Sequence, residues 1–371
     1  MKVLFMANIP SPYRVDFFNE LGKYCNLTVT FEGKTATDRN KRWKAAESQN
    51  FKAQFMKGIR TKSDQFLCLD IIKIIRSDFD QIIVGGYSSP TAMLAIEYMR
   101  LNKIPFWIEA DGGLISQEST LKYKMKRHFI SAASRWLSSG KTTNDYFIHY
   151  GAKRENIYQY PFSSLRENEI LSNMISSEEK RKLRDELKME EEKIVVSVGQ
   201  FIPRKGFDIL LKAWKDCVNE AGLYVIGAEV TEEYVQLQKE LKLKNVHFIG
   251  FKNQKELKKY YQAADIFALM TREDIWGLVI NEAMANGLPV VTTERCVAGL
   301  ELIKNGANGY IVPVENVEET SNALNRILQD ATMQETMAKS NLDKIQNYTI
   351  EQMATKHMEV LENKDYEKNR C

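Results

Sequence analysis

Short apolar runs recur along the whole chain, and several of them end at a glycine or another small residue. Stretches with helical spacing separate many of these runs, for example residues 15–24, 89–101, 207–219 and 277–286. Parallel strands that are buried on both faces of a sheet have this pattern. The sequence therefore predicts an α/β protein with two doubly wound Rossmann-like domains. The expected strands are residues 2–7, 27–31, 81–84, 106–109, 134–138, 193–198, 223–226, 246–249, 266–270, 289–292 and 309–312.

The domain boundaries follow from a change of character near residue 166. Residues 166–192 are predominantly charged and contain no strand pattern before the run at 193, so they are predicted to be a linker and lead-in. We predict an N-terminal domain over 1–165 and a C-terminal domain over 166–348. A capping box at 349–352 opens a last helix, predicted to run to about residue 364, within a segment 349–371 that packs back on the N-terminal domain. The two domains are expected to face a central cleft that holds a nucleotide-bearing substrate.

Composition excludes several classes of protein. Apolar residues are 44% and charged residues 27% of the 371, which excludes a disordered chain. The apolar runs fall short of the roughly 18 residues that span a bilayer. Five cysteines without a paired motif fit a reducing cytoplasm and argue against structural zinc.

Charge is divided unevenly between the two predicted domains. Residues 1–165 carry a net charge of +9 and the remainder −6. A basic first half favours an anionic partner. The alternative is a scatter of solvated lysines.

The segment 272–291 carries the strongest motif. Asp274 lies in a loop after a predicted strand, and Gly277 opens a helix whose unpaired N–H groups at Gly277, Leu278 and Val279 suit an anion. Glu282, further along that helix, is placed to reach vicinal hydroxyls such as those of a ribose. The alternative is that Asp274 only caps the helix and Glu282 is solvated.

A second motif spans 198–206, between a predicted strand and a helix. Gly199 and Gly206 flank a loop that carries Gln200 and the adjacent cations Arg204 and Lys205. An arginine fork beside a lysine suits a diphosphate. The loop lacks the P-loop spacing, and an ordinary turn with exposed basic residues is the alternative.

These motifs in this order resemble retaining glycosyltransferases of family 4, which have the GT-B fold. The resemblance also includes Gly250-Phe251, Ala264-Asp265 and the segment 306–313. In the first half, Ser11-Pro-Tyr-Arg14, Ser139-Gly140, the segment 151–157 and Tyr160-Pro-Phe162 are similar to bacterial polysaccharide-assembly members.

The resemblance implies roles for individual residues. Arg204 and Lys205 would hold the donor diphosphate, Glu282 the ribose, and Asp274 hydroxyls of the transferred sugar. The base would meet the backbone near Phe251 and Lys252, and the donor site would include Gly199, Gln200, Gly277, Leu278 and Val279. The acceptor loop would contain Ser11, Tyr13 and Arg14.

This chain departs from the family pattern at three places. Asp274 stands where most members have Glu, which shortens its reach by one methylene. Gln200 stands where many have Arg, which removes one phosphate cation. The first-domain loop offers Ser11 to Arg14 in place of a glycine pair.

Asp111 follows a strand of the first domain and precedes Gly112-Gly113. A carboxylate at the carboxyl end of a strand is expected to face the cleft, so Asp111 is predicted to contact the acceptor hydroxyl or the donor sugar. An Asp-Gly turn is the alternative.

A basic amphipathic helix is predicted near residues 121–130. It carries Lys122, Lys124, Lys126 and Arg127, which are assigned to an anionic membrane surface. The alternative is a solvated helix face.

The resemblance, together with these motifs, implies a retaining, metal-independent hexosyltransferase-type enzyme in bacterial cell-surface polysaccharide synthesis. It would use a UDP- or GDP-linked sugar as co-substrate, no cofactor or metal, a glycan or lipid-linked acceptor, and no nucleic acid. It is expected in the cytoplasm, peripheral on the inner face of the cell membrane. The alternatives are a non-catalytic GT-B partner subunit of a glycosyltransferase complex, or a GT-B sugar-nucleotide epimerase.

Overall fold

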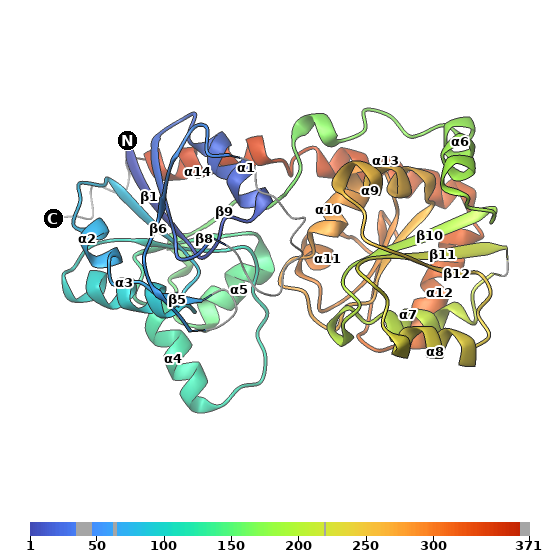
Figure 1. Ribbon diagram of the computed structural model, residues 1–371, viewed down its shortest axis with the longest axis horizontal. Helices are drawn as coiled ribbons and strands as arrows, with labels where there is room; N and C mark the ends of the chain where they lie inside the picture. The colour runs from blue at the N-terminus through green and yellow to red at the C-terminus, as the bar shows by residue number, and fades with distance from the viewer. Residues whose placement is uncertain (35–46, 62–64, 219, 364–371) are drawn as a thin grey trace. The chain divides into compact units, whose positions relative to one another are not determined.

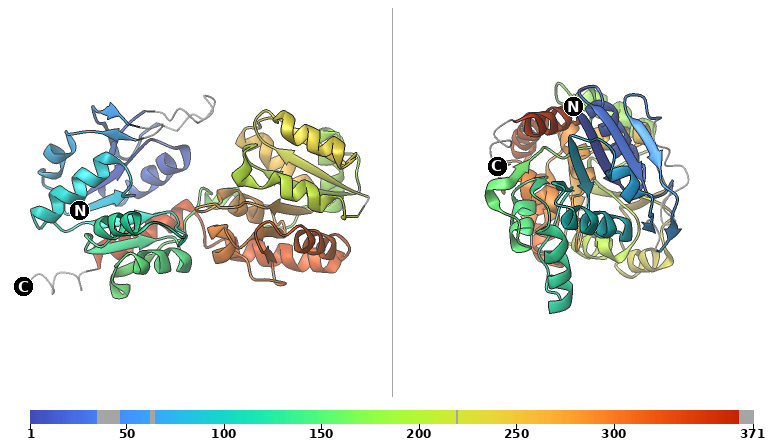
Figure 2. Two further views of the ribbon diagram at one scale, coloured as in Figure 1. Left: turned by 90° about the horizontal axis from the view of Figure 1, so that it is seen from below. Right: turned by 90° about the vertical axis from the view of Figure 1, so that its left-hand side faces the viewer.

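The computed structural model describes residues 1–34, 47–61, 65–218 and 220–363, which form two compact units. Unit 1 contains residues 1–164 and the chain from Tyr348 onward, and unit 2 is Leu165–Asn347 (Figure 1). Each unit is built on a parallel sheet with helices on both faces, as Figure 2 also shows. The predicted α/β class with two doubly wound units is therefore confirmed.

The sheet of unit 1 has seven strands over the described residues, in the order β3-β2-β1-β6-β7-β8-β9. Every neighbouring pair in it is parallel, and β4 and β5 form a separate antiparallel pair. The elements are β1 (Lys2–Ala7), α1 (Pro12–Leu21), β2 (Asn26–Phe31), β3 (Lys52–Phe55), β4 (Ile59–Arg60), β5 (Phe66–Leu67), α2 (Ile71–Ile75), β6 (Gln81–Gly85), α3 (Pro90–Leu101), β7 (Trp107–Ala110), α4 (Thr120–Ile130), β8 (Arg135–Ser138), α5 (Lys141–His149), η1 (Arg154–Asn156), β9 (Ile157–Gln159) and α14 (Ile350–Glu362).

The alternation of side chains along β1 divides the core of unit 1. Leu4 and Met6 pack with buried residues of α2, α3, α4 and α5 on one face. Phe5 points to the other face, where its ring lies 4.8 Å from that of Phe18 on α1. Helix α14 lies beside α1 on that face (Figure 1). The last segment of the chain is therefore part of unit 1.

The sheet of unit 2 has six strands over the described residues, in the order β12-β11-β10-β13-β14-β15, all parallel. The order reverses between β10 and β13, which is where ligands bind in open α/β sheets. The elements are η2 (Glu167–Glu169), α6 (Ser177–Leu187), β10 (Lys193–Val198), η3 (Pro203–Lys205), α7 (Phe207–Trp214), β11 (Ala221–Ile226), α8 (Glu232–Glu240), β12 (Val246–Ile249), α9 (Gln254–Ala263), β13 (Ile266–Leu269), α10 (Leu278–Ala285), β14 (Val290–Thr293), α11 (Val297–Leu302), β15 (Gly309–Val312), α12 (Val317–Leu328) and α13 (Ala331–Ile345).

Strand β13 shows how unit 2 buries both faces of its sheet. Ile266 and Ala268 belong to a core cluster with buried residues of α7, α8 and α12. Phe267 faces the other side, where its ring lies 5.9 Å from that of Tyr261 on α9. No helix among the described residues is long and apolar enough to cross a bilayer.

The elements expected from the sequence are present with small shifts at their ends. The structure also contains a few elements that the sequence did not predict. Strands β3 and β9 were not predicted, because both are short and neither is fully buried. Residues 166–192, predicted to lack a strand, contain η2 and α6. The last helix ends at Glu362, and residues 364–371 of the segment predicted over 349–371 lie outside the described residues.

Candidate functional site

The loop between β10 and α7 is fixed by glycines that permit close backbone contacts. Gly206 has φ 65°, and a Cβ there would lie 1.8 Å from the carbonyl oxygen of Met270. A Cβ on Gly227 would lie 2.1 Å from the carbonyl oxygen of Gly199. Only glycine fits such positions. The loop is therefore held against the carboxyl ends of β11 and β13.

Two cations of this loop meet the carboxylate that follows β13. Lys205 Nζ lies 2.5 Å from Asp274 Oδ2, and Arg204 Nη1 lies 3.6 Å from Asp274 Oδ1. Arg204 Nη1 also donates to the carbonyl oxygen of Glu273 at 2.8 Å. The side chains of Lys205 and Asp274 are 12% and 14% exposed, whereas that of Arg204 is 46% exposed. The structure thus brings together three residues that the sequence placed in two separate motifs.

Helix α10 begins beside this cluster without a side-chain cap. Its N-cap is Gly277, with φ 101°, where a Cβ would lie 2.8 Å from Cys296 Sγ and 3.8 Å from Asp274 Cγ. Leu278 and Val279 of its first turn are only partly buried. A helix start that leaves backbone N–H groups unbonded near Arg204 and Lys205 favours an anion.

Glu282 lies on the same helix and is held by α9. The Tyr261 hydroxyl donates to Glu282 Oε2 at 3.0 Å. Burial raises the pKa of Glu282 to about 7, and the charge of Glu169 adds to this, although the bond from Tyr261 opposes it. The carboxylate is therefore poorly solvated when no ligand accompanies it.

The remaining residues assigned to the donor lie in loops at the same edge of the sheet of unit 2. Gly199 is partly buried and Gln200 is exposed after β10. Phe251 and Lys252 follow β12 and are partly buried, with Lys252 Nζ 6.0 Å from the centre of the Tyr260 ring. All the predicted donor residues thus belong to the carboxyl edge of one sheet.

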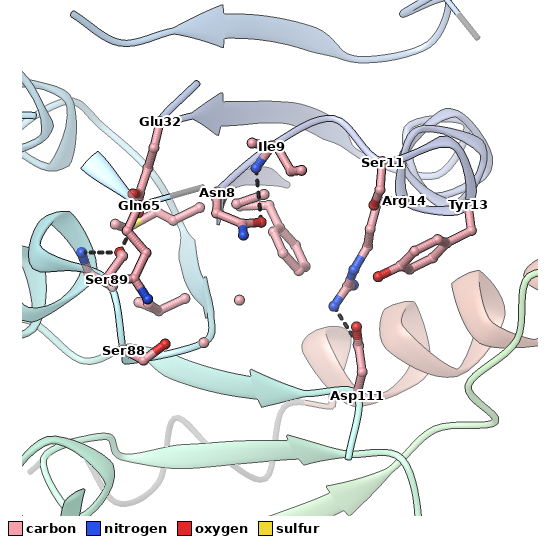
Figure 3. Close-up of a pocket in the computed structure, with 17 residues that line it drawn as sticks. Asn8, Ile9, Ser11, Tyr13, Arg14, Glu32, Gln65, Ser88, Ser89 and Asp111 are labelled. Atoms are coloured by element: carbon pink, nitrogen blue, oxygen red, sulfur yellow. Dashed lines mark hydrogen bonds and ion pairs between the residues drawn. The ribbon is translucent and has the colours of Figure 1, made fainter. Parts of the chain in front are cut away.

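Unit 1 contains a polar pocket of about 260 Å³ at the carboxyl ends of its strands (Figure 3). Ser11, Tyr13, Arg14 and Asp111 line it, as does the unpredicted Glu32. The Ser89 hydroxyl donates to Glu32 Oε1 at 2.5 Å. The sequence-predicted acceptor residues and Asp111 therefore share one cavity, and Glu32 was missed because it stands alone after β2.

Arg14 bridges two carboxylates at one wall of this pocket. Its Nη1 lies 2.5 Å from Glu109 Oε1 and its Nη2 lies 2.5 Å from Asp111 Oδ1. Glu109 is fully buried, whereas the side chain of Asp111 is 22% exposed. Burial raises the pKa of Glu109, but Arg14 and His357 outweigh it and lower the value to about 2. The pKa of Asp111 is raised, by burial and by the charge of Glu109, against the effect of Arg14.

The basic residues assigned to a membrane do not share one environment. Lys122, Lys124 and Arg127 are exposed on α4, beside Leu121 and Met125, which are 80% and 43% exposed. Lys126 instead faces the interior, where its Nζ lies 2.7 Å from Glu118 Oε2 and 3.1 Å from the Tyr150 hydroxyl. Lys126 is therefore corrected from a surface residue to a structural one, because its charge is already paired beneath the helix.

Sequence reasoning missed two buried residues that lie behind the pocket lining, Glu109 and His357. Glu109 was expected only as the end of the strand 106–109, and no role was assigned to His357. His357 Nε2 lies 2.9 Å from Glu109 Oε2, although 248 residues separate them. Single-sequence patterns carry no signal for such a contact.

Several known proteins to which this chain is similar are named glycosyltransferases. Residues 178–343 match the family model described as glycosyl transferases group 1. An uncharacterized glycosyltransferase of Haemophilus influenzae is 28% identical over 57% of this chain and 60% of its own length. Spore coat protein SA of Bacillus subtilis is 30% identical over 52% of this chain and 53% of its own. The chain thus spans little more than half the length of these relatives.

The fold itself is similar over almost the whole chain. Anabaena HepE, whose crystal structure contains UDP, superposes with a TM-score of 0.79 at 20% identity, covering 97% of this chain and 99% of HepE. The fold is therefore GT-B, as the sequence predicts.

The raised pKa of Glu282 gives a prediction for stability. Between the ordinary pKa near 4.5 and the folded value of about 7, the folded state binds more protons than the unfolded state, so stability falls as pH rises through this window. Glu282→Gln removes this penalty and keeps an acceptor for Tyr261. We expect the variant to exceed wild type at pH 8 by roughly 1–3 kcal/mol in urea unfolding, with the gap closing towards pH 5.

Glu335→Gln is the matched control, because Glu335 lies exposed on α13 of the same unit and pairs with the exposed Lys339. Its stability should differ from wild type by a few tenths of a kcal/mol. Equal stability of wild type and Glu282→Gln at pH 8 would contradict a poorly solvated carboxylate with a raised pKa at this position.

Proposed function

We propose that this chain is a retaining glycosyltransferase of family 4 that moves a sugar from a nucleotide-diphosphate donor to a glycan or lipid-linked acceptor. The observation that carries the proposal is the meeting of Arg204, Lys205 and Asp274 beside the uncapped start of α10. Two cations, a helix N-terminus and a hydroxyl-binding acid are what a sugar diphosphate requires. The match of residues 178–343 to group 1 glycosyl transferases supports the same conclusion.

In the proposed mechanism, unit 2 binds the donor and stabilises the leaving group. Charge grows on the diphosphate as the bond to the sugar breaks, and Arg204, Lys205 and the N–H groups at Gly277 would face that charge. These groups would take the role of a metal ion, so the reaction is proposed to be metal-independent. Asp274 would hold hydroxyls of the transferred sugar and Glu282 those of the ribose.

The acceptor is assigned to the pocket of unit 1, where Asp111 is the partly exposed acid. Asp111 would accept a hydrogen bond from the attacking hydroxyl. In a retaining reaction the hydroxyl attacks from the face that the diphosphate leaves, and a phosphate oxygen takes its proton. This stereochemistry follows the family resemblance.

Asp274 and the diphosphate would compete for the same two cations. In the structure the carboxylate of Asp274 neutralises Lys205. When the donor binds, Asp274 is proposed to turn to the sugar while Lys205 and Arg204 bind phosphate oxygens. Asp274 would thus keep Lys205 paired until the donor arrives.

The biological setting is proposed to be synthesis of a bacterial cell-surface polysaccharide at the inner face of the membrane. The spore coat role in the name of the Bacillus subtilis relative points to a surface structure. The UDP held by Anabaena HepE favours a UDP-linked donor. The exposed residues Leu121, Lys122 and Lys124 of α4 offer apolar and basic groups to an anionic lipid surface.

Sugar transfer by the purified protein tests the proposed function. With UDP-sugars and a lipid-linked acceptor extract in the presence of EDTA, we expect transfer by wild type. Lys205→Ala and Arg204→Ala should each slow it about 30-fold to 1,000-fold, because each removes a charged contact to the leaving diphosphate. Asp274→Asn should also lose transfer, yet bind UDP at least as tightly as wild type, because a competing carboxylate is gone.

Lys212→Ala is the control, since Lys212 is a half-exposed lysine of α7 near Asp208 and outside the site. It should transfer at the wild-type rate. Wild-type rates in both cation variants would refute the diphosphate assignment. Loss of transfer in EDTA with recovery in manganese would refute the metal-independent mechanism, and UDP binding without transfer to any acceptor would favour a non-catalytic partner subunit.

Membrane binding through α4 is a separate prediction. Replacing Lys122, Lys124 and Arg127 together with Gln should weaken binding to anionic vesicles by about 100-fold at low salt, because each basic group contributes about 1 kcal/mol. Thermal stability should not change, because all three side chains are exposed. Co-sedimentation with vesicles of phosphatidylglycerol and phosphatidylcholine measures the effect.

Lys126→Gln distinguishes the two sides of the helix. This variant should bind anionic vesicles like wild type but unfold at a lower temperature, because it leaves Glu118 buried without its ammonium partner. Unchanged vesicle binding by the triple variant, or no binding by wild type, would show that α4 is an ordinary solvated helix and does not contact the membrane.

A further inference from the structure

His357, on helix α14, lies behind the lining of the pocket in unit 1, where it contacts Glu109. Its side chain is fully buried, with its ring centre 4.8 Å from that of Phe17 and 4.6 Å from that of Tyr160. Both ring nitrogens meet oxygen atoms. Nδ1 lies 2.7 Å from the carbonyl oxygen of Met353, and Nε2 lies 2.9 Å from Glu109 Oε2.

These two contacts determine how many protons the pair holds. A carbonyl oxygen only accepts hydrogen bonds, so Nδ1 must carry a proton. If His357 were neutral, Nε2 would then be an acceptor, and it would face a carboxylate oxygen that is also an acceptor. The 2.9 Å contact requires a proton between Nε2 and Oε2. The proton positions are assigned from the hydrogen-bond partners. The pair of His357 and Glu109 therefore holds one proton more than a neutral histidine beside an ionised glutamate would hold.

The extra proton balances the charge of a buried cluster. The titratable groups that face the pair are Arg14 from α1, Asp111 after β7, and the phenol of Tyr160, which lies 3.3 Å from Glu109 Oε1 and 3.2 Å from Asp111 Oδ1. Arg14 and a protonated His357 supply two positive charges against Glu109 and Asp111. Uncompensated charge is costly where water is excluded, so a neutral set of four is the favourable arrangement.

Asp111 is the end of this cluster that reaches the pocket. Its side chain is 22% exposed, while Glu109 and His357 are fully buried. Figure 3 shows Arg14 and Asp111 pointing to each other at the pocket wall. If the proton were absent, two carboxylates would share one guanidinium, and the negative charge of Glu109 would favour the protonated form of Asp111. A protonated Asp111 donates its proton and cannot serve an attacking hydroxyl as a carboxylate.

We propose that His357 and Glu109 are positioning residues of this pocket, and that the proton they share keeps Asp111 ionised and bound to Arg14 for the acceptor. The proposal rests on the proposed function for the identity of the acceptor, but the proton itself is a property of the folded chain. It gives the last helix a role in the acceptor pocket besides packing on α1.

Nuclear magnetic resonance of the full chain tests the proton directly. The chain has four histidines, so the ring nitrogens of His357 can be assigned by comparison with His357→Gln. We expect both ring nitrogens of His357 to be protonated at pH 7. In Glu109→Gln, whose amide can donate to Nε2, His357 should carry a single ring proton.

Titration of the Asp111 carboxyl carbon, assigned with Asp111→Asn, separates positioning from mere packing. His357→Gln removes a positive charge, so Asp111 should ionise at a higher pH than in wild type. Glu109→Gln removes a negative charge that shares Arg14 and the Tyr160 hydroxyl with Asp111. The positive charge that His357 loses in the same variant lies beyond the other oxygen of Glu109, so the nearer change dominates and Asp111 should ionise at a lower pH. The acid limb of the pH profile of kcat/KM for the acceptor should move in the same two opposite directions, and His357→Gln should lose about 10-fold to 100-fold in kcat/KM at neutral pH and recover at higher pH.

His247→Gln is the matched control, because His247 also pairs with a glutamate, Glu191 at 2.6 Å, but belongs to unit 2 and does not line this pocket. It should leave the Asp111 titration and the acceptor kinetics unchanged. A single ring proton on wild-type His357 at pH 7, or an Asp111 titration that neither variant moves, would overturn the proposal. If His357→Gln does not fold, Glu109→Gln alone decides between these outcomes.

The two proposals fail in different ways. A doubly protonated His357 in a protein that transfers no sugar would count against the proposed function and leave the cluster intact. Sugar transfer by a protein whose His357 carries a single ring proton would overturn the cluster alone.

Discussion

Parallel strand pairing is the constraint on which both units depend. In a parallel sheet all carboxyl ends lie at one edge, so loops far apart in the sequence must lie side by side. In unit 2 this edge brings Lys205, after β10, to Asp274, after β13, at a distance of 2.5 Å. In unit 1 it gathers the ends of β1, β2, β6 and β7 around one polar pocket. The chemistry of each unit is therefore set by strand order before any single side chain is considered.

Both sites hold their buried charges in ion pairs. Asp274 neutralises Lys205, and Arg14 is shared by Glu109 and Asp111. Buried charges require such partners, because leaving one uncompensated costs more than an ordinary hydrogen bond contributes. Under the proposed function, a diphosphate that enters the site in unit 2 exchanges partners with the ion pair of Lys205 and Asp274. This exchange would make the site in unit 2 selective for groups that can replace a carboxylate.

Much of the fold could be predicted from the sequence, because fully buried strands leave a continuous apolar run. The limits expected for β10, β12 and β15 agree with the structure. Strand β3 was not predicted because its two end residues are exposed and its two middle residues only half-buried, so it carries no such run. Helix α7 ends at Trp214, earlier than its spacing suggested.

The local motifs of unit 2 could also be read in advance, since each lies within one loop or one helix turn. The contact of Glu109 with His357 could not, because it joins β7 to the last helix. The inward direction of Lys126 could not be predicted for a related reason, because its partners Glu118 and Tyr150 lie outside helix α4. Helical spacing alone does not show which basic side chain has a buried acid beneath it.

Hydrogen exchange of the full chain with and without UDP tests the central claim most directly, namely that the loop 199–206 and the start of α10 form one diphosphate site in unit 2. The account predicts that UDP slows exchange at the amides of Gly277, Leu278 and Val279 and across residues 199–206, and leaves the amides around the pocket of unit 1 unchanged. Slowed exchange confined to unit 1, or no protection at the start of α10 with UDP bound, would contradict it.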